Sequence, residues 1–235
     1  SAYVLATSQK HALSQKAAFK LRDDQLFISC YPRNCRCLKY MEYEEQIIQK
    51  IKQAKLSILY VPTFRTDYSK YTHPLSLPKV KDFLKQNNYL WIEKPHSAEK
   101  HSAIYEIDDV NILKLDSDFD INIIYEFSSI VISDYSSAVF DAVYKSIPVI
   151  MYVPDLEIYE SGDNGLWEDP RTYCKPILAF NGEEICQLTE KLANGSFFDK
   201  DTLDFYNRIK TDYYENRESE YEIIWNDIKN TLGGG

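Results

Sequence analysis

The stretch IVISDYSSAVFDAVYKSIPVIMYV (residues 130–153) contains two apolar runs separated by a polar segment and a helix-forming segment. This pattern predicts strands over residues 130–133 and 148–153, with a helix over residues 137–145 between them. Strands connected in this way are typical of a parallel sheet, because the helix returns the chain to the end from which the next strand starts. We therefore expect an α/β fold.

The same alternation extends over most of the chain. Further strands are expected over residues 26–29, 56–61, 89–93 and 112–115, and further helices over residues 43–54, 79–86 and 183–193. After residue 195, apolar residues recur only at helical spacing, which predicts two closing helices. We expect a Rossmann-like parallel sheet with flanking helices, as one domain over residues 1–195 with the helices of residues 196–235 packed on it.

Composition and charge restrict the classes of function. The 235 residues are 44% hydrophobic and carry a formal net charge of -9 at pH 7, so we expect a sizeable core and no nucleic-acid partner. Any phosphate recognition must therefore be local. The longest apolar runs are far shorter than the roughly 20 residues that span a bilayer, and no leading segment is typical of a secretion signal. A cytoplasmic protein is expected.

Glycine and cysteine positions exclude several common sites. None of the seven glycines precedes Gly162, whereas the Walker-type loop and the dinucleotide fingerprint both need glycine between a strand and a helix. The five cysteines lack the paired spacing of zinc ribbons. Cys30, Cys35 and Cys37 have no obvious fourth ligand, so no metal is expected. An anion site in this chain must be built from other donors.

Three polar segments follow predicted strands. They are Pro62-Thr63-Phe64-Arg65, Lys94-Pro95-His96 and Asp134-Tyr135-Ser136-Ser137. Ligands of open parallel sheets bind beyond the carboxyl ends of the strands, so we expect these segments to converge on one site. Within the first of them, Arg65 can bind a phosphate in bidentate fashion or form a surface ion pair with Asp67.

The other two segments also permit two interpretations each. Ser136 and Ser137 can cap the following helix, or they can direct hydroxyls and helix amides at a phosphate. His96 can be structural or solvated, or it can join Lys94 in placing two cationic donors on one anion. Surface roles are assigned to the remaining histidines, which are His11, His73 and His101.

An ordered series of motifs carries a resemblance to a known family. The motifs are Tyr31-Pro32-Arg33-Asn34, Ile58 to Arg65, Lys94-Pro95-His96, Ser133 to Ser137 with Phe140-Asp141, Pro148 to Tyr152, and Asp155 to Tyr159 with Gly165-Leu166. Over residues 2–192 the chain resembles the CDP-glycerol glycerophosphotransferase family. The resemblance implies the carboxyl-terminal, donor-binding domain of a two-domain GT-B architecture, in bacterial enzymes that build teichoic acids or capsular polymers.

The resemblance also implies a reaction. An acceptor hydroxyl attacks the distal phosphorus of CDP-glycerol or a similar CDP-polyol and releases CMP, with no metal or other cofactor. The implied catalytic residues are His96, Lys94 and Arg65, and the implied substrate-binding residues are Thr63, Asp134, Ser136, Ser137, Arg33 and Asn34. His96 with Lys94 would stabilise the diphosphate and the departing CMP, while Arg65 with Thr63 would hold phosphate oxygens.

Two departures from the family pattern limit what we expect of this chain. Cys30 and Cys35 stand where family members usually carry a glycine and an acidic residue. The family's presumed general base is a histidine followed by glycine, and none of the four histidines here precedes a glycine. We therefore expect an amino-terminal acceptor domain or a partner chain to supply the base, and a polymer or lipid-linked glycan to be the acceptor.

Two alternative functions stay open at this point. One is a non-catalytic CDP-polyol-binding module, and the other is a GT-B glycosyltransferase or epimerase that uses another nucleotide sugar. Lipid-linked acceptors would place the protein at the inner face of the cell membrane, although its acidic charge gives this placement no independent support. The sequence does not specify the polyol, the acceptor or the oligomeric state.

Overall fold

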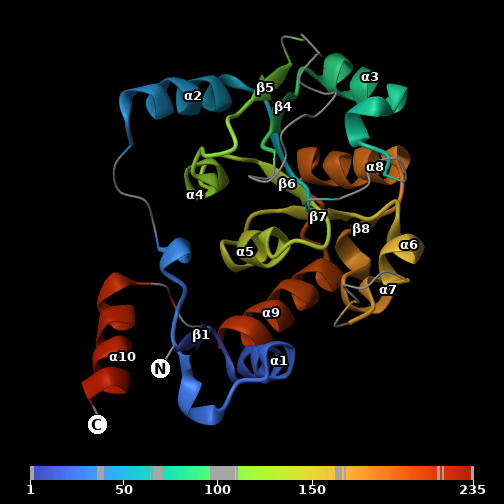
Figure 1. Cartoon of the computed structure of the whole chain (residues 1–235). Coiled ribbons are helices and arrows are strands. Elements are labelled where there is room, and N and C mark those ends of the chain that lie inside the picture. Colours follow the sequence, from blue (N-terminus) through green and yellow to red (C-terminus); the bar gives the residue numbers. More distant parts are fainter. Residues whose placement is uncertain are drawn as a thin grey trace. The chain divides into compact units, whose positions relative to one another are not determined.

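The computed structural model describes residues 3–35, 40–63, 65, 71–95, 109, 111–161, 166, 168–215, 218 and 220–233. Contacts divide the chain into two compact units (Figure 1). The larger unit is Tyr40–Phe205, and the smaller unit combines Ser1–Lys39 with Tyr206–Gly235. This division differs from the one drawn from the sequence, which placed residues 1–195 in one domain.

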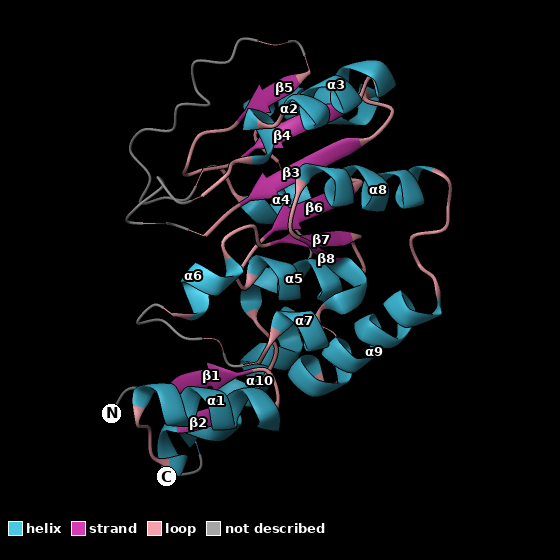
Figure 2. Ribbon diagram, turned by 90° about the vertical axis from the view of Figure 1, so that its right-hand side faces the viewer, coloured by secondary structure: helices cyan, strands magenta, loops and turns pink. Residues whose placement is uncertain are grey.

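The larger unit is built on a parallel sheet. In the described part of the chain this sheet has six strands, in the order β5-β4-β3-β6-β7-β8. The strands are β3 (Ser57–Val61), β4 (Leu90–Glu93), β5 (Ile112–Lys114), β6 (Ile130–Ser133), β7 (Val149–Tyr152) and β8 (Leu178–Ala179). All neighbouring pairs are parallel, and Figure 2 shows the strands side by side. The expected α/β fold is confirmed.

Helices cover both faces of this sheet. They are α2 (Glu42–Gln53), α3 (Pro78–Asn87), α4 (Ile121–Tyr125), α5 (Ala138–Tyr144), α6 (Leu156–Glu160), α7 (Pro170–Tyr173) and α8 (Gly182–Ala193). In Figure 1, α2, α4 and α5 lie on one face, and α3 and α8 lie on the other. Because both faces are covered, every residue of β3, β6 and β7 is buried, and these strands consist of nearly uninterrupted apolar runs.

The smaller unit contains a second, separate pair of parallel strands. These are β1 (Val4–Ala6) and β2 (Leu26–Ile28), connected by α1 (Gln9–Phe19). The closing helices are α9 (Lys200–Tyr214), which begins in the larger unit, and α10 (Tyr221–Gly233), as the sequence predicted. The Thr7 hydroxyl donates to the Tyr213 carbonyl, and the Ser8 hydroxyl donates to the Asp212 carbonyl. These hydrogen bonds connect the residues after β1 to the end of α9.

The structure changes what was expected of the first strands. Residues 26–29 were expected to belong to the main sheet, whereas β2 pairs with β1. Sequence reasoning missed β1 and β8, because strands of three and two residues are too short to show a period. It also missed α1, in which Ala12 is the one buried residue, so that no apolar stripe marks the helix.

Two isoleucines in the larger unit test how much this core contributes to stability. Ile150→Ala removes a fully buried side chain from β7 and should lower the free energy of unfolding by about 2 to 5 kcal/mol. Ile158→Ala removes the same atoms from α6, where the side chain is 47% exposed, and should change it by only about 0.5 kcal/mol. Urea unfolding measures both losses, and equal losses would contradict the burial of β7.

Candidate functional site

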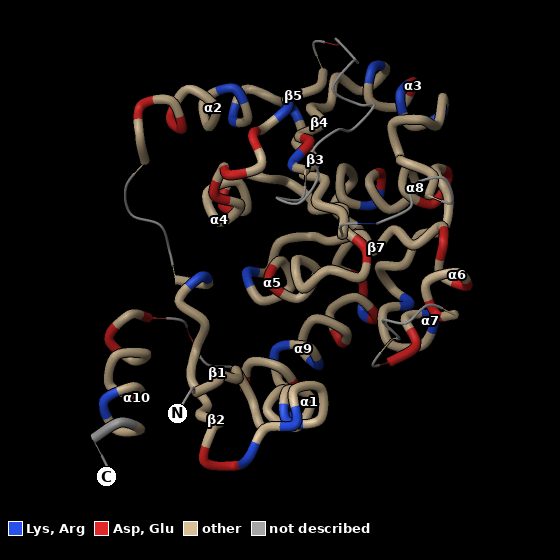
Figure 3. The backbone as a smooth tube through the Cα atoms, in the orientation of Figure 1, with Lys and Arg blue, Asp and Glu red and all other residues tan. Residues whose placement is uncertain are grey.

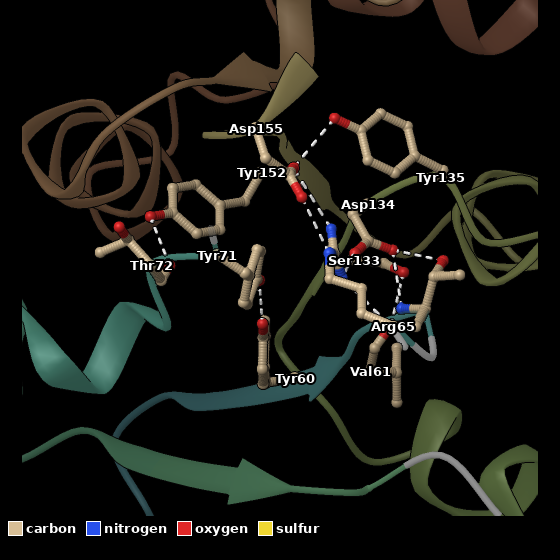
Figure 4. A network of polar contacts seen from close by, with 11 residues as sticks. Tyr60, Val61, Arg65, Tyr71, Thr72, Ser133, Asp134, Tyr135, Tyr152 and Asp155 are labelled. Carbon is tan, nitrogen blue, oxygen red and sulfur yellow. Dashed lines mark hydrogen bonds and ion pairs between the residues drawn. The ribbon is translucent and has the colours of Figure 1, made fainter. Parts of the chain in front are cut away.

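Polar side chains gather at one edge of the six-stranded sheet. Strand β3 pairs in parallel with β6, and β6 pairs in parallel with β7, so the carboxyl ends of these strands lie beside one another. The segments that follow them meet there, as expected for a ligand site of an open parallel sheet. Figure 4 shows the resulting network of polar contacts.

The carboxylate of Asp134, directly after β6, is the first junction of this network. Asp134 is 1% exposed, and its Oδ1 accepts hydrogen bonds from the Thr63 amide at 2.8 Å and the Thr63 hydroxyl at 2.6 Å. Its Oδ2 lies 2.7 Å from a terminal nitrogen of Arg65. The Ser133 hydroxyl also donates to the Val61 carbonyl at 2.6 Å. The ends of β3 and β6 are therefore joined by side chains as well as by the ladder.

The guanidinium of Arg65 is the second junction, and it is buried rather than on the surface. Its Nε donates to Asp155 Oδ2 at 2.8 Å, and a terminal nitrogen donates to Asp155 Oδ1 at 3.3 Å. The other terminal nitrogen donates to the Thr63 carbonyl at 3.0 Å. Burial alone would lower the pKa of Arg65, but the hydrogen bond to Asp155 and the charge of Asp134 raise it above its usual value. The arginine is therefore permanently charged.

Asp155 was not among the predicted site residues. It follows β7 and lies 90 positions from Arg65 in the chain, so no local spacing connects the two residues. Its place after a predicted strand was the available signal, because the other site segments share that place. The predicted alternative partner of Arg65, Asp67, lies outside the described residues.

Tyrosines surround the two junctions. The Tyr135 hydroxyl donates to Asp155 Oδ1 at 3.1 Å, and its ring stacks on Tyr159 with a centroid distance of 3.6 Å. Burial and the charge of Asp155 raise the pKa of Tyr135 far above its usual value, so the hydroxyl keeps its proton. The ring of Tyr71 lies 3.8 Å from the Arg65 guanidinium carbon, which adds a cation–π contact. Sequence reasoning assigned no role to these rings.

Lys94 follows β4, the neighbour of β3, and thus lies at the same edge of the sheet. Its ammonium donates to the Ser117 carbonyl at 2.8 Å. Burial lowers the pKa of Lys94, while Asp118 and Asp120 oppose the change. These acidic residues belong to the segment between β5 and α4, where Figure 3 shows acidic positions gathered. His96, predicted to act with Lys94, lies outside the described residues.

Two of the histidines assigned to the surface are packed against other side chains, which corrects that expectation. His73 Nε2 lies 3.1 Å from Glu93 Oε1, and its Nδ1 accepts from the Leu75 amide. The ring also packs edge-on against Tyr60, so the side chain is 18% exposed. In the smaller unit, burial lowers the pKa of His11. The third histidine, His101, lies outside the described residues.

Ser136 and Ser137 differ in exposure and in hydrogen bonding. Ser136 Oγ accepts a hydrogen bond from the Ala138 amide at 3.2 Å, so it satisfies the first amide of α5 from one position before the N-cap residue. Ser137 is exposed and makes no side-chain capping bond. A contact of either hydroxyl with a phosphate stays a prediction.

The remaining predicted residues, Arg33 and Asn34, belong to the smaller unit. They lie in a short 3-10 helix, Pro32–Asn34, where Asn34 is buried and the Arg33 guanidinium lies 4.1 Å from the centre of the Tyr31 ring. Their assignment to the substrate site stays a prediction.

The described part of the chain contains no residue cluster typical of a metal site and no helix able to span a membrane. No three His, Cys, Asp or Glu side chains there are grouped so as to hold a metal ion. Cys30, Cys35, Cys174 and Cys186 are buried free thiols. Within the same residues, no helix combines the length and apolarity needed to cross a membrane.

Curated proteins similar to this chain act in teichoic acid synthesis by name. A teichoic acid poly(glycerol phosphate) polymerase of Bacillus spizizenii is 28% identical over 227 residues, covering 89% of this chain and 54% of that protein. A teichoic acid ribitol-phosphate primase of the same species is 28% identical over 151 residues, covering 60% of this chain and 38% of the primase. The chain thus spans about half the length of the first of these relatives, and less of the other.

Solved structures share the fold at low identity. The wall teichoic acid polymerase TagF matches with a TM-score of 0.65 and 20% identity, covering 98% of this chain and 58% of that one. The UDP-GlcNAc 2-epimerase of Neisseria meningitidis, bound to UDP-GlcNAc, matches with a TM-score of 0.58 and 12% identity, covering 100% and 62%. These likenesses confirm the expected fold and carry no further conclusion about function.

The family is decided by a match over most of the chain. The model of the family described as CDP-Glycerol:Poly(glycerophosphate) glycerophosphotransferase matches residues 1–223. Those residues include all the ordered motifs, the whole larger unit and most of the smaller unit. The chain therefore belongs to the CDP-glycerol:poly(glycerophosphate) glycerophosphotransferase family.

Proposed function

We propose that this chain supplies the donor-binding half of a polyol-phosphate transferase. The donor is CDP-glycerol or a related CDP-polyol, and the acceptor is a hydroxyl of a cell-wall or capsular polymer or a lipid-linked glycan. One observation carries the assignment. The family's motif residues Lys94, Thr63 and Asp134 follow three adjacent strands, β4, β3 and β6, and so meet at the carboxyl edge of one sheet.

The reaction is a displacement at phosphorus. The acceptor oxygen forms a bond to the distal phosphorus of the donor, and the bond from that phosphorus to the bridging oxygen breaks. CMP leaves with the bridging oxygen, and the acceptor hydroxyl loses its proton to a base. Negative charge spreads over the phosphate oxygens in the transition state, so the protein mainly positions the groups and supplies fixed positive charge.

Lys94 is the described residue best suited to supply that charge. Its ammonium has three N–H donors, and the Ser117 carbonyl accepts from one of them. Another can reach a diphosphate oxygen at the carboxyl edge of the sheet. His96 follows two residues later, beyond Pro95, and is assigned as the second donor to the diphosphate and the departing CMP. No metal enters this assignment.

Activation of the acceptor is assigned to another part of the complete protein. The matches cover 54% and 26% of the two poly(glycerol phosphate) polymerases among the curated relatives, and none of the four histidines here precedes a glycine. An amino-terminal acceptor domain or a partner chain would supply the base. Together they would work in the cytoplasm, at the inner face of the membrane where lipid-linked acceptors are presented. The 12% identity with an epimerase shows fold alone, so no epimerase activity is proposed.

Ligand preference is the first test. In calorimetric titrations, CDP-glycerol or CDP-ribitol should bind, CMP should bind more weakly because it lacks the second phosphate, and UDP-GlcNAc should give no response. A variant of the polymerase TagF has been soaked with CDPG, so that structure offers a reference ligand. Binding of UDP-GlcNAc without any response to cytidine compounds would reject both the transferase and a CDP-polyol-binding module.

Replacement of Lys94 tests the source of positive charge. Lys94→Met keeps much of the side-chain volume and should reduce CMP release about a hundredfold to a thousandfold, because one electrostatic donor to the transition state is lost. CMP release is measured in the complete protein with a polymer acceptor. Lys50→Met, on an exposed position of α2, removes the same charge and should leave the rate unchanged. Equal rates for the two variants would exclude Lys94 from the site.

The pH dependence of donor binding gives an independent test of the same residue. Burial lowers the pKa of Lys94, so its ammonium loses the proton at a lower pH than an ordinary lysine does. Affinity for CDP-glycerol should therefore be highest below that pKa and fall as the pH rises through it. Titrations from about pH 7 to about pH 10 should show this fall in the wild type and not in Lys94→Met. The same alkaline fall in both proteins would assign the titration to another group.

A further inference from the structure

The contacts of Arg65 leave little room for a substrate phosphate. All three guanidinium nitrogens already face protein oxygens: Nε and one terminal nitrogen face Asp155, and the other terminal nitrogen faces Asp134 and the Thr63 carbonyl. The side chain is only 7% exposed. Figure 4 shows the guanidinium between the two carboxylates. A phosphate that took one of the N–H donors in these contacts would have to displace a buried carboxylate or the Thr63 carbonyl.

Displacement of that kind is unfavourable on charge grounds. Two buried carboxylates share one guanidinium, so removing part of the guanidinium would leave a buried negative charge with poorer compensation. The incoming phosphate would bring further negative charge to the same place. A cation that binds phosphate directly is better placed outside such a cluster, as Lys94 is in its contact with a neutral carbonyl.

Asp155 links the arginine to the segment that carries the serines. Its Oδ1 accepts from Arg65 and from the Tyr135 hydroxyl, and Tyr135 stands between Asp134 and Ser136 in the chain. Two contacts therefore hold the segment Asp134-Tyr135-Ser136 in place. Thr63, after β3, donates to Asp134, and Asp155, after β7, accepts from Tyr135. Movement of Asp155 would release the hold from the β7 side, and it would weaken the other through Arg65, which joins Asp155 to Asp134.

We propose that Arg65 and Asp155 are positioning residues, which hold Thr63 and the segment Asp134-Tyr135-Ser136 in the arrangement that receives the donor diphosphate. Arg65 makes no contact with the donor itself, in contrast to the role that the resemblance implied. The part concerning the donor rests on the proposed function, whereas the holding of the two segments does not.

Asp155→Asn distinguishes positioning from direct phosphate contact by the sign of its effect. The amide keeps the shape of the carboxylate but cannot accept from Arg65 at both atoms. If Arg65 positions the loops, affinity for CDP-glycerol should fall at least tenfold. If Arg65 binds phosphate, loss of a competing carboxylate should leave affinity unchanged or raise it. Calorimetry is run well below the melting temperature of every variant, so that a loss of stability alone does not change the result.

Two further variants complete the binding experiment. Arg65→Lys keeps the charge but not the fork, so positioning and a bidentate phosphate contact both predict a loss of affinity, and a matching loss in Asp155→Asn assigns it to positioning. Asp82→Asn removes one negative charge from an exposed position of α3 and should bind as the wild type does. If Asp82→Asn also lowered the affinity for CDP-glycerol tenfold, the change in net charge alone would explain the loss in Asp155→Asn, and the proposed roles would be overturned.

Hydrogen exchange without ligand tests the holding of the segments separately. The Thr63 amide donates to Asp134 and the Ala138 amide donates to Ser136, so both should exchange at least tenfold faster in Asp155→Asn than in the wild type. Unchanged exchange would overturn the positioning role even if donor binding fell. A wild type that binds no cytidine compound would reject the proposed function and leave the exchange result to decide the positioning role.

A milder variant covers the case in which Asp155→Asn does not fold. Tyr135→Phe removes one hydrogen bond to Asp155 and keeps the ring that stacks on Tyr159. It should speed exchange of the Ala138 amide and weaken CDP-glycerol binding several-fold, with Tyr43→Phe on an exposed position of α2 as the control. Wild-type exchange and affinity in Tyr135→Phe would overturn the link from Asp155 to the serine segment.

Discussion

A buried arginine connects three strand ends in the larger unit. Arg65 follows β3, and its guanidinium lies between Asp134, after β6, and Asp155, after β7. Moving charges out of water costs several kcal/mol per ion unless close partners and further hydrogen bonds compensate. Thr63 and Tyr135 provide such hydrogen bonds to the two carboxylates. Ion pairs between Arg65 and the two carboxylates therefore hold the ends of β3, β6 and β7 together.

The same cluster limits where a diphosphate can bind. Its two carboxylates exceed its one guanidinium, so it does not by itself attract an anion, and the whole chain carries a net charge of -9. Positive charge for a phosphoryl transfer must come from beside the cluster. Lys94 follows the neighbouring strand β4, and its ammonium contacts a neutral carbonyl instead of a carboxylate.

Fold and family contribute differently to the functional conclusion. The sheet and its helices are shared with a polymerase and with an epimerase at 20% and 12% identity, so this architecture is compatible with more than one reaction. The family model that matches residues 1–223 is what assigns this chain to one family among the users of the fold. Glycerol and ribitol enzymes are both among the relatives, so the family leaves the polyol open.

Much of the fold was predictable because the main strands are buried on both faces. Burial on both faces requires apolar side chains at every position, so β3, β6 and β7 appear as continuous apolar runs, and the helices between them show the helical period. The convergence of Thr63, Lys94 and Asp134 on one edge followed from their positions after such strands. Strands as short as β1 and β8 left no comparable pattern.

By itself, the sequence determined the longer strands and helices and their order, the polar segments at the strand ends and the motif series of the family. Only the tertiary structure decided which polar groups pair with one another. Arg65 and Asp155 are 90 positions apart. They meet because the sheet places β6 beside both β3 and β7, whereas β4 and β5 separate β3 from β6 along the chain. Local periodicity reports which face of an element is buried, whereas a side-chain ion pair depends on how distant elements are placed beside one another.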